Sequence, residues 1–108
     1  MNVITVQAKL KEEHVADAEA AVKRMFAAIE REQLEGIRYA SVKLEDGVSF
    51  LALLELEDGV ENPLAGLPEA QEFYDSLPSW YAEPPAFGPA TVVGSYRFFT
   101  DAVTADQA

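Results

Sequence analysis

Residues 37–57 read IRYASVKLEDGVSFLALLELE, and this stretch decides the fold. Two apolar-rich runs flank the pair Asp46-Gly47. An Asp-Gly pair between such runs is the strongest short-range signal of a β-hairpin, because a type I′ turn needs a positive φ at both central residues. The sequence therefore predicts two antiparallel strands joined by a two-residue loop at Asp46 and Gly47.

This loop fixes the register of the predicted hairpin. Tyr39 then faces Leu54 on one side of the sheet, and Val42 faces Leu51 on the other. Both faces are apolar in the middle, whereas a sheet with one face in water alternates apolar and polar side chains. One face needs the chain's own helices as a cover. The other has no cover in so short a chain, so we expect a second copy of the protein there.

The composition of the chain excludes several classes of function. The 108 residues carry a formal net charge of −11, which argues against binding to nucleic acid or to an anionic membrane surface. The chain has no cysteine, which excludes disulfides, thiolate metal sites and cysteine nucleophiles. The N-terminus leads directly into a strand pattern, and no apolar run is long enough to span a bilayer. We therefore expect a cytoplasmic protein.

The remaining elements follow from changes of period along the chain. Apolar residues alternate over residues 3–10, which predicts a strand, and recur every three or four residues over 11–35, which predicts an amphipathic helix. Gly36 is placed to end this helix in the left-handed conformation. A second helix is expected over residues 68–77, ended by Pro78, followed by an irregular proline-rich segment at 83–89. A last strand is expected over residues 90–99, and residues 101–108 form a tail that is frayed or contacts a partner.

The element order strand, helix, strand, strand, helix, strand predicts one α+β domain over residues 1–100 with the ferredoxin-like βαββαβ fold. We expect one antiparallel four-stranded sheet with two helices on one face. In this arrangement the first strand pairs with the third, and the fourth pairs with the second.

This element order, the long first helix, the tight hairpin and the last strand with its motif VVGSYR at residues 92–97 resemble the antibiotic biosynthesis monooxygenases of the dimeric α+β barrel superfamily. The resemblance covers residues 2–99. It implies a homodimer whose two sheets face each other, and a pocket between sheet and helices in each subunit. Members of the family include oxygenases that need no cofactor and act on polycyclic phenols, and also haem-degrading enzymes.

Two positions depart from the family pattern. Oxygenases of this group usually carry a tryptophan at the end of the third strand, where this chain has LELE at residues 54–57. They often carry a histidine in the following helix, and residues 68–77 contain none. The haem-degrading pattern also needs that histidine, so the sequence argues against haem.

Six residues are candidates for binding a small aromatic ligand. They are Tyr39, Asn62, Tyr74, Trp80, Tyr81 and Arg97. The aromatic side chains either line a ligand cleft or fill the core. Arg97 either pairs with a substrate anion or with a carboxylate on a neighbouring strand. The only histidine, His14, lies beside Glu13 and Asp17, and a solvated helix end explains this group better than a metal site.

Two functions of different classes remain open from the sequence. The first is a monooxygenase without metal or cofactor, which binds an aromatic polyketide-like phenol and stabilises its enolate through Arg97 and tyrosine hydroxyls. The second is a non-enzymatic dimeric barrel that binds a small molecule or has a structural role. A pocket filled entirely by the protein's own aromatic side chains favours the second function, and an open cavity argues against it.

Overall fold

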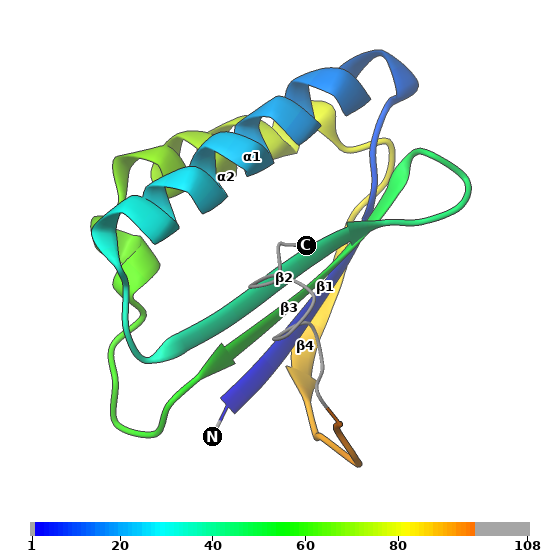
Figure 1. Ribbon diagram of the computed structural model, residues 1–108. Helices are drawn as coiled ribbons and strands as arrows, with labels where there is room; N and C mark the ends of the chain where they lie inside the picture. Colours follow the sequence, from blue (N-terminus) through cyan, green and yellow to red (C-terminus); the bar gives the residue numbers. More distant parts are fainter. Residues whose placement is uncertain (1, 97–108) are drawn as a thin grey trace.

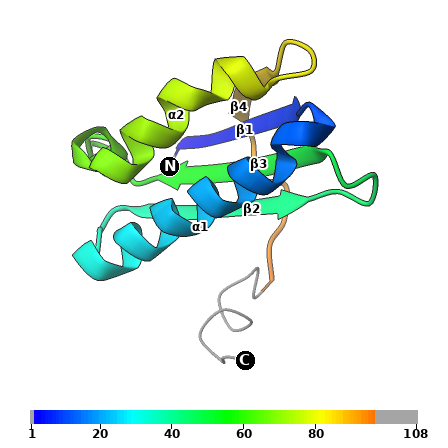
Figure 2. The ribbon, with the colours of Figure 1, turned by 90° about the horizontal axis from the view of Figure 1, so that it is seen from above.

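The computed structural model describes residues 2–96. Four strands form one antiparallel sheet: β1 (Asn2–Lys9), β2 (Ile37–Lys43), β3 (Ser49–Leu56) and β4 (Ala86–Ala90). The helices α1 (Val15–Glu32) and α2 (Pro68–Trp80) lie side by side on one face of this sheet (Figures 1 and 2), and short 3-10 turns precede each of them, η1 (Glu12–His14) and η2 (Pro63–Gly66). The predicted ferredoxin-like βαββαβ fold is therefore confirmed.

The strand order is β2-β3-β1-β4, so β4 pairs with β1, and the predicted pairing of the last strand with the second is wrong. The reason is the hand of the crossovers. The α1 connection runs from β1 across β3 to β2, and the α2 connection runs from β3 across β1 to β4. Because β1 and β3 are antiparallel, both connections can be right-handed on the same face only if they cross the sheet in opposite directions.

The hairpin of β2 and β3 has the predicted register but a different turn. Tyr39 pairs with Leu54 and Val42 with Leu51, as expected. Gly47 has φ +79°, whereas Asp46 has no positive φ, so the turn is not type I′. The Leu44 N–H donates to the Ser49 carbonyl at 2.8 Å, which leaves four loop residues in place of two. The extra residues are shared equally between the two strands, and the register is unchanged.

The Asp46 carboxylate explains this longer loop. It accepts hydrogen bonds from the backbone N–H groups of Val48 and Ser49 at 2.9 and 2.8 Å, and from the Ser49 hydroxyl at 2.6 Å. These bonds to the ionised form hold the pKa of Asp46 below its ordinary value, led by the bond from Ser49. A short polar side chain that bonds its own backbone two residues on is typical of turns.

Three boundaries differ from the sequence prediction. Helix α1 ends earlier than expected, because Gln33, with φ 51°, takes the left-handed position predicted for Gly36. Helix α2 continues through Pro78 to Trp80, since one missing N–H donor in the last turn is tolerated. Strand β4 lies at residues 86–90, within the segment predicted to be irregular. The sheet accepts Pro89 there because β4 is an edge strand. Of the predicted strand at 90–99, residues 91–96 have no regular structure, and the rest lies outside the described residues.

Position 36 still requires glycine, because of a close contact in the tertiary structure. Its φ is +83°, and a Cβ atom there would lie 2.8 Å from Cγ1 of Val60. We expect Gly36→Ala to lower the free energy of unfolding by about 2–3 kcal/mol, combining left-handed strain with the clash. Gly59→Ala is the control, because Gly59 has φ +76° but nothing within 4 Å of its Cβ position. Urea unfolding of both variants checks this, and equal losses would contradict the role of Val60.

Candidate functional site

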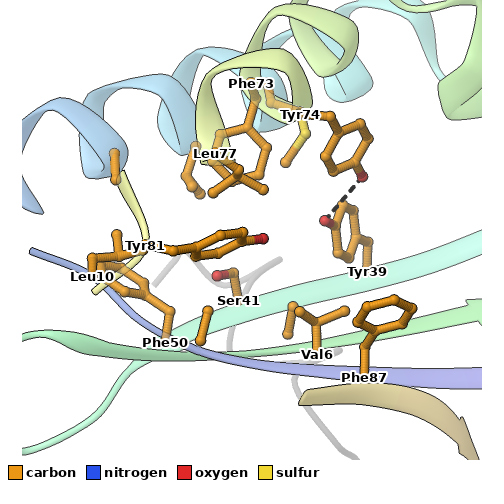
Figure 3. A pocket seen from close by; sticks show the side chains of 15 residues that line it. Val6, Leu10, Tyr39, Ser41, Phe50, Phe73, Tyr74, Leu77, Tyr81 and Phe87 are labelled. Carbon is orange, nitrogen blue, oxygen red and sulfur yellow. Dashed lines mark hydrogen bonds between the residues drawn. The ribbon is translucent and has the colours of Figure 1, made fainter. Parts of the chain in front are cut away.

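A cavity of about 200 Å³ lies between the sheet and the two helices (Figure 3). Every strand and both helices contribute to its wall. The lining residues are Val6, Ala8, Leu10, Ala18, Val22, Met25, Tyr39, Ser41, Phe50, Ala52, Phe73, Tyr74, Leu77, Tyr81 and Phe87.

The cavity exists because small side chains meet across the layer. Ala18 of α1 faces a part of the sheet that carries Ala8 and Ala52 at neighbouring positions. Two core clusters pack tightly around Met25 and Leu64 on one side and around Leu10 on the other. The space between these clusters is left open, because the alanine side chains on the helix and on the sheet are too short to fill it.

The Tyr39 and Tyr74 hydroxyls lie 3.2 Å apart at the cavity wall and share one hydrogen bond. The Tyr39 ring packs against Phe26, with ring centroids 5.0 Å apart. Burial, followed by the neighbouring Tyr74, raises the pKa of Tyr39 well above its ordinary value of 10.0. Tyr39 therefore presents a neutral hydroxyl near pH 7. Since only one of the two protons is used in their mutual bond, the other can be donated to a ligand.

Tyr81 enters the cavity from the opposite side, and its hydroxyl points across the cavity towards the side on which Tyr39 lies (Figure 3). Its backbone is held firmly against the end of β1. The Lys11 N–H donates to the Trp80 carbonyl, and the Ala82 N–H donates to the Lys9 carbonyl, both at 2.8 Å. Burial raises the pKa of the Tyr81 hydroxyl, so this group is also a neutral donor.

Three of the six predicted ligand-binding residues, Tyr39, Tyr74 and Tyr81, meet at this cavity. Asn62 does not line it: its side chain accepts a hydrogen bond from the Leu64 N–H at 3.0 Å and begins η2. Trp80 packs behind the wall, with its ring centroid 6.4 Å from that of Phe73. Arg97 lies outside the described residues. The ligand-binding role of the three tyrosines stays a prediction.

Ser41 and Phe87 are two of the twelve lining residues that were not among the candidates. Ser41 follows Tyr39 on the same face of β2, so strand alternation alone could have found it. Phe87 lies in the segment expected to be irregular, and only its pairing with Val6 brings it to the cavity. The Phe87 side chain is 73% exposed, so the cavity reaches the surface beside it.

Among the described residues, no three His, Cys, Asp or Glu side chains come together in a way that could hold a metal ion. His14 forms an ion-pair contact with Asp17, at 3.7 Å between Nδ1 and Oδ2. None of the described residues that line the cavity carries a formal charge. No helix in residues 2–96 is both long and apolar enough to cross a lipid bilayer.

No family model matches the sequence, and no curated protein matches it either. Solved structures do match across most of the chain. A candidate antibiotic biosynthesis monooxygenase from Bacteroides thetaiotaomicron superposes with a TM-score of 0.70 at 10% identity, covering 86% of this chain and 90% of that one. Another from Nitrosomonas europaea has a TM-score of 0.67 at 15% identity, covering 85% and 89%.

This is the fold of the antibiotic biosynthesis monooxygenases. One structure with the same fold is SnoaB from Streptomyces nogalater, a cofactor-independent oxygenase, with a TM-score of 0.64 at 13% identity over 87% of this chain and 94% of that one. The resemblance drawn from element order is thus confirmed for the fold. At such identities the antibiotic biosynthesis monooxygenase fold does not transfer an activity, and the site must be argued from its own residues.

Proposed function

We propose that this protein is a cofactor-independent monooxygenase that oxidises a small phenol in the cavity between the sheet and the helices. The observation that carries the proposal is the set of tyrosine hydroxyls, Tyr39, Tyr74 and Tyr81, in a mostly apolar wall. The fold shared with a cofactor-independent oxygenase supports it.

The chemistry needs an electron-rich substrate carbon next to a stabilised oxygen anion. The phenol releases its proton to solvent at the mouth beside Phe87, since no described lining residue is a base. The hydroxyl of the Tyr39–Tyr74 pair whose proton is not used in their mutual bond then donates to the anion, and does so more strongly in a dry cavity than in water. The ring carbon reduces dioxygen and forms a C–O bond, and loss of water leaves a carbonyl. In balance, one oxygen atom of O₂ becomes the new carbonyl, and the other leaves as water with the hydrogens of the phenol O–H and the ring C–H, so the phenol becomes a quinone.

Oxygen uptake tests this proposal. The protein is first titrated with a naphthol-type phenol without oxygen, following the emission of Trp80, which packs against the lining residue Phe73. Oxygen is then admitted and its uptake recorded. Saturable change in emission followed by uptake above the rate without protein supports the monooxygenase. Binding without uptake would contradict it.

A second function is favoured by one observation. Catalysis of proton transfer uses a base within hydrogen-bond reach of the substrate, and the described lining residues include none. In this alternative the protein is a dimer that binds a small aromatic molecule in the same cavity and catalyses no reaction. Binding without oxygen uptake, for every phenol tried, is the result expected for this alternative.

We also propose that the protein is a homodimer through the sheet face opposite the helices. No helix of the described chain covers that face (Figure 1), and it carries apolar side chains of β2 and β3, such as Val42, Leu51 and Leu53. These side chains are only half buried. A self-complementary patch of this kind is typical of two-fold dimers.

Leu53→Lys tests the dimer. Leu53 is at the centre of the face, paired with Thr5 on one side and Ala40 on the other. A charge there must be desolvated in the dimer, so we expect a shift to monomer by more than about a hundredfold in the dissociation constant, measured by analytical ultracentrifugation. Ala16→Lys on the exposed surface of α1 is the control and should remain dimeric. A wild-type monomer at micromolar concentration would contradict the proposal.

A further inference from the structure

We propose that the cavity selects uncharged aromatic compounds of one or two fused rings, and that Leu77 is the residue that sets this size limit. The proposal rests on the proposed role of the cavity as a ligand site, and names the class of compound it takes. With this limit, the protein would not accept the polycyclic phenols of three or more rings that a larger cavity could hold.

The volume of the cavity sets the first limit. At about 200 Å³ it exceeds the roughly 150 Å³ engineered cavity that binds benzene, but is smaller than the roughly 300 Å³ at which pockets for drug-sized ligands begin. From this comparison we expect one ring to fit with room to spare, two fused rings to fill the enclosed space, and a third ring to displace side chains or to protrude into water.

The two polar walls cannot move apart to admit a longer ligand. On one side, Tyr39 is held by its bond to Tyr74 and by the Phe26 ring. On the other, Tyr81 forms a β-bridge with Leu10, and the next residue, Ala82, donates its N–H to the Lys9 carbonyl of β1. The mouth beside Phe87 opens to water, so extra enclosed length must come from the helix side of the cavity.

Leu77 occupies that side. It lies on α2 one turn after Tyr74 and one turn before Tyr81, and points into the cavity between them (Figure 3). Its backbone carbonyl accepts the Tyr81 N–H at 3.2 Å, and this bond does not depend on the side chain. Truncation at position 77 thus enlarges the cavity between the two polar walls without releasing Tyr81.

The lining sets the second limit, on charge. The polar groups that face the ligand are the hydroxyls of Tyr39, Ser41, Tyr74 and Tyr81, with no cation among the described lining residues. Hydroxyls can satisfy a phenol or a carbonyl. An ionised carboxylate must enter already charged and loses its hydration without gaining an opposite charge, which is strongly unfavourable. A phenol enters neutral and ionises only beside the tyrosine donors.

Binding without oxygen tests both limits, using isothermal titration calorimetry at pH 7. The probes are 2-naphthol, 2-anthrol, 2-naphthoate and, as the neutral match for naphthoate, 2-naphthamide. We expect 2-naphthol and 2-naphthamide to bind, and 2-anthrol and 2-naphthoate to bind more weakly by about tenfold or more, because of size and charge respectively. Leu77→Ala should strengthen the binding of 2-anthrol by about tenfold or more. Ile29→Ala, an apolar truncation in the core away from the cavity, should not.

The outcomes are distinct from those of the proposed function. Equal binding of 2-anthrol and 2-naphthol by the wild-type protein would overturn the size limit, whether or not Leu77→Ala folds. Equal binding of 2-naphthoate and 2-naphthamide would overturn the charge limit. If 2-naphthoate bound to the wild-type protein but not to Arg97→Ala, Arg97 would be the cation that pairs with the carboxylate. Selective binding with no oxygen uptake leaves this inference standing and removes the monooxygenase.

Discussion

Replacing Met25 by alanine is expected to lower the free energy of unfolding by about 2–5 kcal/mol, the range for a large-to-small substitution at a fully buried site. Met25 is 1% exposed and belongs to the core cluster with Leu64 and Ala70. It also lines the cavity, so its truncation enlarges an existing space. A domain of this size is stable by only about 5–15 kcal/mol, and the loss is therefore a large fraction of the total.

Urea unfolding monitored by circular dichroism measures this loss. Met25→Leu is the matched control, because it keeps the volume and should cost less than about 1.5 kcal/mol. Saturating 2-naphthol should raise the unfolding midpoint of Met25→Ala, since a ligand that binds only the folded state stabilises it. A loss below about 1 kcal/mol would mean that the helices collapse onto the cavity, against the packing described here.

Replacing Tyr39 by phenylalanine is expected to lower kcat for phenol oxidation by about a hundredfold or more, as for removal of one donor to a developing anion. The change removes the hydroxyl that lies 3.2 Å from that of Tyr74. It keeps the ring and its contact with Phe26. The loss should therefore appear mainly in kcat, with a small effect on KM and on the unfolding midpoint.

Tyr96→Phe is the control for Tyr39→Phe, because Tyr96 is 81% exposed and does not line the cavity. Single-turnover oxygen uptake with a naphthol-type phenol, at saturating substrate, separates the chemical step from binding. An unchanged kcat in Tyr39→Phe would remove this hydroxyl from the mechanism. A loss of kcat matched by an equal loss of folded protein would show a structural role instead.

Local sequence patterns predicted the structure best at the hairpin of β2 and β3, where the chain reverses direction. The Asp46-Gly47 pair and its flanking runs gave the hairpin register correctly, although the turn itself is longer, because register depends on the apolar pattern over many residues. The turn type depends on one side chain, Asp46, which bonds Val48 and Ser49 and favours the four-residue loop. The end of α1 was misplaced for a similar reason, as Gln33 adopted the conformation expected of glycine.

Near the C-terminus, the local preferences of proline predict an irregular segment where the structure has β4. Pro89 is incompatible with a central strand, yet the pairing of β4 with β1 places it at an edge. Which strand lies at an edge is a property of the whole sheet, and is set by the hand of both crossovers.

The sequence by itself determined the ferredoxin-like fold, because periodicity and turn residues act locally and their order allows few topologies. It also indicated Tyr39, Tyr74 and Tyr81, since large polar-tipped aromatics on core-facing positions are conspicuous. Only the tertiary structure decided that these three meet at an open space while Asn62 and Trp80 do not. A cavity is the volume left over when helices and sheet pack, so it depends on pairs such as Ala18 and Ala8 that are distant in sequence.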